Sequence, residues 1–179
     1  MFEKIETEIP GLFIIRPRII TDKRGKFIKL FHNEMFNDLG LQSDFREEYF
    51  STSAKGVLRG LHFQTPPAQH VKCITCLRGE IFDAVVDLRK EAPTYGKYFS
   101  IVLKAAEPTI LYIPEGMAHG FMSLTESSVF LNKTTTVFDA ECDSGIRWDS
   151  CGIIWPKISI ILSEKDKKMP PFSEYNSPF

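Results

Sequence analysis

Three side chains of types that move protons near neutral pH stand at His62, Lys72 and His119. Histidine is the natural general base in this range, because its unperturbed pKa is about 6.5. Lysine supplies positive charge where a reaction creates an oxyanion. Together in one cavity, a base and an oxyanion partner suit abstraction of a proton next to a carbonyl group. This is the chemistry of enolisation and epimerisation.

Each of these residues also has an ordinary structural explanation. A single histidine on a strand is usually exposed or hydrogen-bonded within the core, and Arg59 taken alone is more often solvated than bound to phosphate. Lys72 is the most informative, since a lysine facing inward from a mostly apolar strand is costly unless it is paired or functional. The other two histidines, His32 and His70, have no chemical context in the sequence.

The segments that must position these side chains are short apolar and aromatic runs separated by Gly, Pro, Asp and Asn. Many short strands with frequent turn residues favour an all-β sandwich or barrel. The predicted strands are Leu12–Ile15, Lys26–Phe31, Gly56–Phe63, Val71–Leu77, Ile81–Leu88, Tyr98–Leu103, Thr109–Ile113, Phe121–Leu124 and Ser128–Thr135.

Two short segments have helical character. Glu34–Leu39 follows Asn33, a candidate N-cap, and ends at a glycine. Ser163–Lys168 is charged and is followed by Pro170. The Pro- and Ser-rich tail predicts an extended or mobile terminus.

One motif narrows the type of barrel. Pro114–His119 (PEGMAH) follows a predicted strand and resembles the second motif of the cupin superfamily. The first cupin motif usually supplies an H-x-H pair for a metal, whereas Gly60–Gln64 (GLHFQ) contains one histidine. Two histidines without a supporting carboxylate make a poor transition-metal site. We therefore expect a cupin-type jelly roll without a metal, and a metal-dependent oxygenase is the least favoured function.

Composition excludes several classes of partner. The chain of 179 residues is 43% hydrophobic and 25% charged, with a net charge of −1, which gives no general attraction for nucleic acid or anionic membrane. We expect one domain over residues 1–179 and, without a signal or membrane-spanning pattern, a cytoplasmic location. Cys73 and Cys76 have the C-x-x-C spacing of some redox and zinc sites, but they stand in a predicted strand, where they would point to opposite faces. We therefore interpret them as ordinary strand residues.

Six ordered blocks resemble the dTDP-4-dehydrorhamnose 3,5-epimerase family over residues 5–168. They are Asp22–Phe27 (DKRGKF), Gly56–Gln64 (GVLRGLHFQ), Gly79–Arg89 (GEIFDAVVDLR), Ile113–Phe121 (IPEGMAHGF), Gly152–Pro156 (GIIWP) and Leu162–Asp166 (LSEKD). The resemblance implies a homodimer that binds a nucleotide-diphosphate sugar and needs no metal or redox cofactor.

The resemblance also implies roles for individual residues. His62 would be the catalytic base, with Asp166 as the carboxylate that orients its ring and stabilises its protonated form. Lys72 would face the enolate oxygen at sugar C4. His119 and Asp83 would support that lysine in the pocket. Arg59 and Arg24 would contact the diphosphate. Phe27, in the same motif as Arg24, is a further implied substrate-binding residue.

The sequence departs from the family pattern at a position expected to be catalytic. Family members usually have a tyrosine before a Lys-Thr/Ala-Thr run, and this tyrosine returns a proton to the opposite face of the sugar. Here Asn132 occupies that place, and its amide cannot act as a general acid near neutral pH. Loss of the tyrosine suggests inversion at one carbon only, with water or another residue supplying the proton.

The region expected to bind the nucleotide base also differs. A tyrosine pair that usually follows is replaced by Val137 and Phe138, and the stretch that usually reads Q-D-N-H-S is Glu47–Ser51 (EEYFS), which contains Tyr49. The family's R-G-x-F-x-E pattern ends in Lys29. Loss of one stacking ring and changed polar partners leave CDP and GDP sugars open beside dTDP sugars.

The leading hypothesis is an epimerase of a nucleotide-diphospho-4-keto-6-deoxyhexose, acting at one carbon, for which we favour C3. Its product would serve a surface polysaccharide such as O-antigen. A 3,4-ketoisomerase is an alternative, as it shares the barrel and the enolate. A second alternative is a nucleotide-sugar-binding cupin without turnover, which Asn132 would explain.

Overall fold

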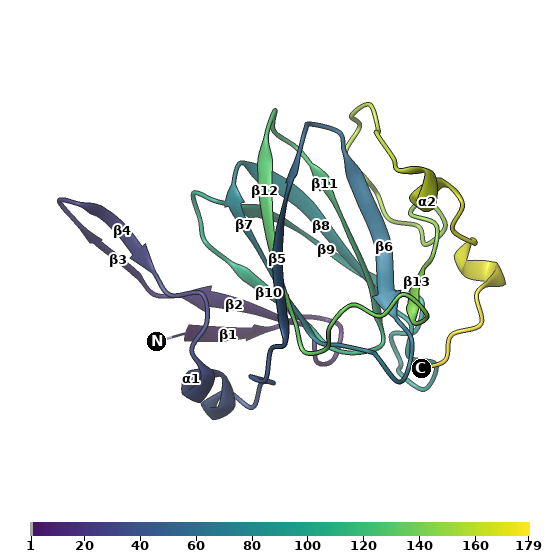
Figure 1. The fold of residues 1–179 in the computed structure, drawn as a ribbon, viewed down its shortest axis with the longest axis horizontal. Helices are drawn as coiled ribbons and strands as arrows, with labels where there is room; N and C mark the ends of the chain where they lie inside the picture. The colour runs from purple at the N-terminus through teal and green to yellow at the C-terminus, as the bar shows by residue number, and fades with distance from the viewer. Residues whose placement is uncertain (1) are drawn as a thin grey trace.

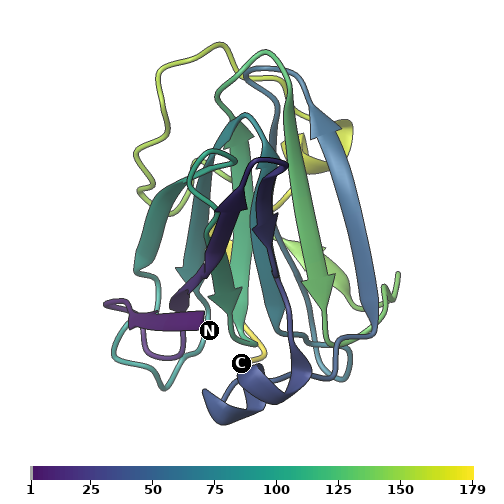
Figure 2. The same ribbon diagram turned by 90° about the vertical axis from the view of Figure 1, so that its left-hand side faces the viewer.

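The structure, a computed structural model, describes residues 2–179. Two antiparallel sheets pack face to face, and a two-stranded arm extends away from them (Figure 1). Figure 2 shows the molecule from the side of the arm. One sheet has the strand order β1-β2-β10-β7-β12-β5, and the other has the order β13-β6-β11-β8-β9. The arrangement confirms the prediction of an all-β sandwich with few short helices.

The strands of the larger sheet are β1 (Phe2–Glu6), β2 (Phe13–Pro17), β10 (Ile110–Ile113), β7 (Lys72–Arg78), β12 (Ser128–Thr134) and β5 (Glu47–Ser53). The second sheet contains β13 (Asp143–Gly145), β6 (Leu58–Gln64), β11 (Met117–Ser123), β8 (Glu80–Asp87) and β9 (Tyr98–Lys104). The arm is β3 (Ile19–Asp22) paired with β4 (Gly25–Ile28), and the helical elements are α1 (Asn33–Asp38), α2 (Glu164–Lys167) and η1 (Phe172–Glu174).

The core lies between the sheets and follows from the alternation of side chains along each strand. Ile74 and Cys76 of β7 pack in the same buried cluster as Ile81 of β8 and Phe121 of β11. Cys73 belongs to a second cluster on the other face of the larger sheet. The two residues of the C-x-x-C pair therefore lie on opposite faces of their strand, as predicted.

Each of the nine predicted strands overlaps an observed one, with ends shifted by a few residues. The prediction omitted β1, β3, β5 and β13. β1, β5 and β13 are edge strands, and β3 pairs only with β4. An edge strand can be polar because much of its surface faces solvent, so its sequence lacks the apolar run of a central strand.

The helical predictions are confirmed in place and wrong in one detail: Asn33 lies inside α1, and the N-cap is His32, which makes no side-chain cap bond. The tail, for which the sequence predicted an extended or mobile terminus, packs against the second sheet. Its last residue, Phe179, contacts Phe63, and Ser177 Oγ donates to the Leu88 carbonyl at 2.5 Å. Within residues 2–179, the helices are all too short to cross a bilayer.

Candidate active site

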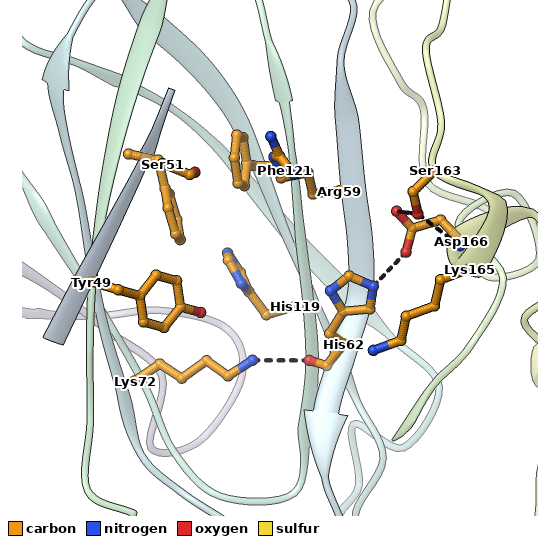
Figure 3. Close-up of a pocket in the computed structure, with 11 residues that line it drawn as sticks. Tyr49, Ser51, Arg59, His62, Lys72, His119, Phe121, Ser163, Lys165 and Asp166 are labelled. Carbon is orange, nitrogen blue, oxygen red and sulfur yellow. Dashed lines mark hydrogen bonds and ion pairs between the residues drawn. The ribbon is translucent and has the colours of Figure 1, made fainter. Parts of the chain in front are cut away.

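A cavity of about 330 Å³ opens between the sheets where β5 and β6 face each other. Figure 3 shows the side chains that line it. His62, Asp166 and Arg59 lie on one side, and Tyr49 and Ser51 lie on the other, with Lys72 and His119 between them. The three residues that suggested proton transfer in the sequence therefore meet in one cavity.

An irregularity in β6 explains how Arg59 and His62 reach the same cavity. Residues three apart on a regular strand point to opposite faces. Here His62 pairs with His119 and Arg59 pairs with Phe121, so β6 has one residue more than β11 in this interval, as in a β-bulge. Gly60 lies at the bulge with φ of 139°, and a Cβ there would be 2.5 Å from the Gly120 Cα. Only glycine permits this close approach of the two strands.

His62 and Asp166 form a dyad. His62 Nε2 is 2.5 Å from Asp166 Oδ1, while the ring remains partly open to the cavity, with 32% of the side chain exposed. Ser163 caps α2 and donates from Oγ to Asp166 Oδ2 at 2.8 Å. Burial acts to raise the pKa of Asp166, but the bonds from His62 and Ser163 hold it below its ordinary value. The ionised carboxylate fixes Nε2–H on the imidazole and leaves Nδ1 to accept a proton.

Lys72 is buried at the base of the cavity. Its Nζ donates to the backbone carbonyl of His62 at 2.9 Å. Burial lowers the pKa of Lys72 to about 8, although the charges of Asp83 and Asp143 act to raise it. The ammonium is therefore mostly charged at pH 7, and its other hydrogens are available to an oxyanion in the cavity.

His119 and Asp83 form a fully buried pair behind this lysine. His119 Nε2 lies 3.0 Å and 2.9 Å from the two carboxylate oxygens of Asp83, and its ring stacks on Phe130. Burial lowers the pKa of His119, so its imidazole is neutral at pH 7. Asp83 is 0% exposed and lies outside the cavity lining, where its charge acts to raise the pKa of Lys72.

The wall opposite His62 carries Tyr49 and Asn132. These residues are direct partners in the antiparallel pairing of β5 with β12. Asn132 is buried, and its Nδ2 donates to the Tyr49 hydroxyl at 2.7 Å. In the described part of the chain, Asn132 Oδ1 has no hydrogen-bond partner. Burial raises the pKa of Tyr49, so the phenol keeps its proton at neutral pH.

A second cavity of about 290 Å³ adjoins the first and shares Tyr49, His62 and Lys72 with it. Glu47 and Phe138 line this cavity, and Glu47 Oε2 accepts from the Phe138 amide at 2.9 Å. Val137 is 60% exposed and does not line either cavity. Three of the residues expected near the nucleotide base, Glu47, Tyr49 and Phe138, thus line the cavity beside the reactive one.

Arg24 and Phe27 lie on the β3–β4 arm, away from the cavity of their own chain (Figure 1). The Arg24 side chain is 85% exposed and pairs with Asp22 at 2.6 Å. Within one chain the arm does not bury Phe27, which is 62% exposed. The expectation that Arg24 joins Arg59 at one diphosphate is not met inside a single chain.

The cavity-lining residues that sequence reasoning missed include Ser163, Lys165 and His70. His70 had a usable signal, since it is two residues before Lys72 and so shares its face of the chain. Burial lowers the pKa of His70 to about 3, which keeps it neutral. Lys165 pairs with Asp143 at the rim. Over residues 2–179, no group of three or more His, Cys, Asp or Glu side chains is placed to hold a metal ion.

Comparison with known proteins shows the family. The profile described as dTDP-4-dehydrorhamnose 3,5-epimerase matches residues 6–174. The chain is 42% identical to the dTDP-4-dehydrorhamnose 3,5-epimerase of Methanothermobacter thermautotrophicus over 97% of this chain and 96% of that protein.

Solved structures agree with the sequence match. The dTDP-6-deoxy-D-glucose-3,5-epimerase of Legionella pneumophila, in complex with dTDP-4-keto-L-rhamnose, has a TM-score of 0.94 and 34% identity, covering 98% of this chain and 95% of that one. ChmJ of Streptomyces bikiniensis, a 3'-monoepimerase in complex with dTDP-quinovose, has a TM-score of 0.89 and 27% identity, covering 93% and 86%. The cupin-type fold is thus confirmed, and the chain belongs to the dTDP-4-dehydrorhamnose 3,5-epimerase family and is an isomerase of that type.

Proposed function

We propose that the protein inverts C3 of a nucleotide-diphospho-4-keto-6-deoxyhexose through an enolate. The observation that carries this proposal is the convergence of the His62–Asp166 dyad and the buried Lys72 ammonium on one cavity. A base and a cation placed this way suit removal of a proton next to a ketone and stabilisation of the resulting enolate.

In the proposed first half-reaction, His62 Nδ1 takes the C3 proton. The electron pair of the broken C–H bond moves into the ring, and the C4 ketone becomes an enolate. Lys72 stands at the enolate oxygen, and Asp166 stabilises the imidazolium that forms. In the second half-reaction, a proton reaches C3 from the opposite face and the ketone re-forms.

The choice of C3 and of one carbon has two supports. Asn132 stands where the family pattern has an acid, so a proton donor on this wall must occupy a different position, from which we expect it to serve one of the two carbons. A 3'-monoepimerase is among the proteins with the same fold.

The second cavity is the proposed site of the nucleotide. Arg59 is exposed at the cavity edge and donates to Ser53 Oγ at 3.2 Å, with further donors left for a diphosphate. Phe138 supplies an aromatic face for the base, and the Glu47 carboxylate beside it accepts from N–H groups. An acceptor there favours bases with an exocyclic amino group, so CDP and GDP sugars belong in the test beside the dTDP sugars bound by relatives.

A homodimer is the proposed assembly. The arm exposes Ile19, Ile20 and Phe27, and a projecting arm of this kind gains burial only against another chain. An arm laid against a second copy would also give Arg24 a route to a diphosphate that it lacks within its own chain. Sedimentation of the purified protein tests the dimer, and a monomer at micromolar concentration would contradict it.

The test of function is NMR in deuterated water with dTDP-, CDP- and GDP-4-keto-6-deoxyhexoses in parallel. Deuterium entering at C3 alone, with formation of the C3 epimer, is the expected result for one nucleotide. Exchange at C5 as well would show that the enzyme acts at two carbons and would contradict inversion at C3 alone. A lack of exchange with all three would contradict the proposal and favour a sugar-binding protein.

A further inference from the structure

Epimerisation needs two groups on opposite faces of the sugar. If His62 both removed and returned the proton, the carbon would recover its original configuration. Inversion therefore requires a proton donor on the wall that faces His62. That wall is formed by β5 and β12, and the residue expected to donate there from the family pattern is replaced by Asn132.

Tyr49 is a phenol on that same wall. It lines both cavities, and Figure 3 shows its hydroxyl pointing into the pocket toward the side that holds His62. The other tyrosines, Tyr95, Tyr98, Tyr112 and Tyr175, do not line either cavity. Among residues 2–179, Tyr49 is thus the phenol that can reach a sugar held between the walls.

Asn132 is arranged to serve this phenol. Its Nδ2–H donates to the Tyr49 oxygen at 2.7 Å, which leaves the phenolic hydrogen free to point at the substrate. The same bond would stabilise a phenolate after the proton has left. Asn132 contacts the hydroxyl end of the Tyr49 side chain. The phenol oxygen therefore lies close to the place that a side chain at position 132 reaches.

The family pattern differs from this chain at both residues of the contact. The stretch that usually reads Q-D-N-H-S implies Asn at the position of Tyr49, and the Lys-Thr/Ala-Thr run implies Tyr at the position of Asn132. These two positions are direct cross-strand partners. Relative to the pattern that the resemblance implies, the two residue types are exchanged across one strand pair, so a phenol still stands on this wall of the pocket.

We propose that Tyr49 is the catalytic acid that protonates the enolate on the face opposite His62, with Asn132 as the residue that positions it. This rests on the proposed enolate reaction. The Tyr49 O–H bond breaks and a C–H bond forms at the sugar carbon, while the enolate electron pair makes that bond and the C4 carbonyl returns. Water then reprotonates the phenolate and takes the proton held by His62, so no proton or electron is gained or lost overall.

The test is Tyr49→Phe, with Tyr95→Phe as the matched control because Tyr95 lies outside both cavities. Two rates are measured by NMR in deuterated water: deuterium entry at C3 of the substrate, and formation of the C3 epimer. Tyr49→Phe is expected to keep deuterium entry and KM within a few-fold of wild type, because His62 still removes and returns the proton. Epimer formation is expected to fall about 100-fold or more, as for loss of a general acid.

Epimer formation by Tyr49→Phe within threefold of wild type would overturn the proposal. A parallel fall of exchange and epimer formation would overturn it too, since that pattern indicates a structural role. Tyr49→Asn alone and combined with Asn132→Tyr provide a second test: the double variant is expected to form more epimer than the single one. If wild type exchanges no proton with any nucleotide sugar tested, the proposed function fails, whatever Tyr49 does.

Discussion

The two walls of the active-site pocket differ in how far each follows the family pattern. The β6 wall retains the expected dyad, since His62 and Asp166 meet at 2.5 Å and Arg59 lies beside them. The facing β5–β12 wall carries Tyr49 and Asn132, both of which depart from the pattern.

The contrast separates the two halves of the proposed reaction. Proton removal depends on geometry that the bulge at Gly60 fixes, and on a lysine that the fold buries at the base of the cavity. In the proposed reaction, proton return depends on one phenol, that of Tyr49, whose hydroxyl meets Asn132 on the neighbouring strand. The proposal therefore predicts that the phenol can be supplied from position 49 or from position 132, whereas proton removal requires His62 itself.

The largest expected effect comes from the β6 wall. His62→Asn should lower both deuterium entry and epimer formation by about 100-fold to 10,000-fold, because His62 is the one imidazole that β6 places in the cavity among the residues the structure describes. NMR in deuterated water measures both rates. His32→Asn, at the start of α1 and outside the cavities, is the control. If the His62→Asn variant still exchanges the proton at the wild-type rate, the catalytic base is another residue.

Lys72→Met should lower both rates by about 100-fold, as for loss of one stabilising group at an oxyanion. Its Tm should stay the same or rise, since the variant removes a charged group whose burial is costly. In wild type, kcat should fall as pH rises through about 8, where Lys72 loses its proton. Lys104→Met is the control, and a pH profile that stays flat to pH 10 would contradict the role.

The smallest effect is expected at the proposed base site. Phe138→Ala should raise KM by about 10-fold with little change in kcat, because a stacking ring contributes about 1–3 kcal/mol and acts on ground state and transition state alike. Steady-state kinetics with the selected nucleotide sugar measure this split. Ile154→Ala removes an apolar side chain that is even more exposed and lies outside both cavities, and it should change neither constant. A fall in kcat alone would place Phe138 at the sugar instead of the base.

Central strands were predictable because they are buried and apolar along most of their length. β7 is an example, and Lys72 stands out in it as a polar group in an apolar run. Only the second half of β11 was predicted as strand, and His119 in its first half was found through the motif Pro114–His119. The strand β5 was not predictable, since its sequence EEYFSTS is polar and mostly exposed. Tyr49 therefore had no assigned face in the sequence, and its role could not be separated from that of its neighbours.

The sequence by itself determined the family, the all-β fold and the members of the dyad, because these depend on ordered motifs and on the periodicity of buried strands. Only the tertiary structure decided that Arg59 and His62 share a face, that the arm carries Arg24 away from its own pocket, and that Tyr49 stands against Asn132. These are contacts between strands distant in the chain. Register and bulges set them, and neither is encoded in the pattern of one strand alone.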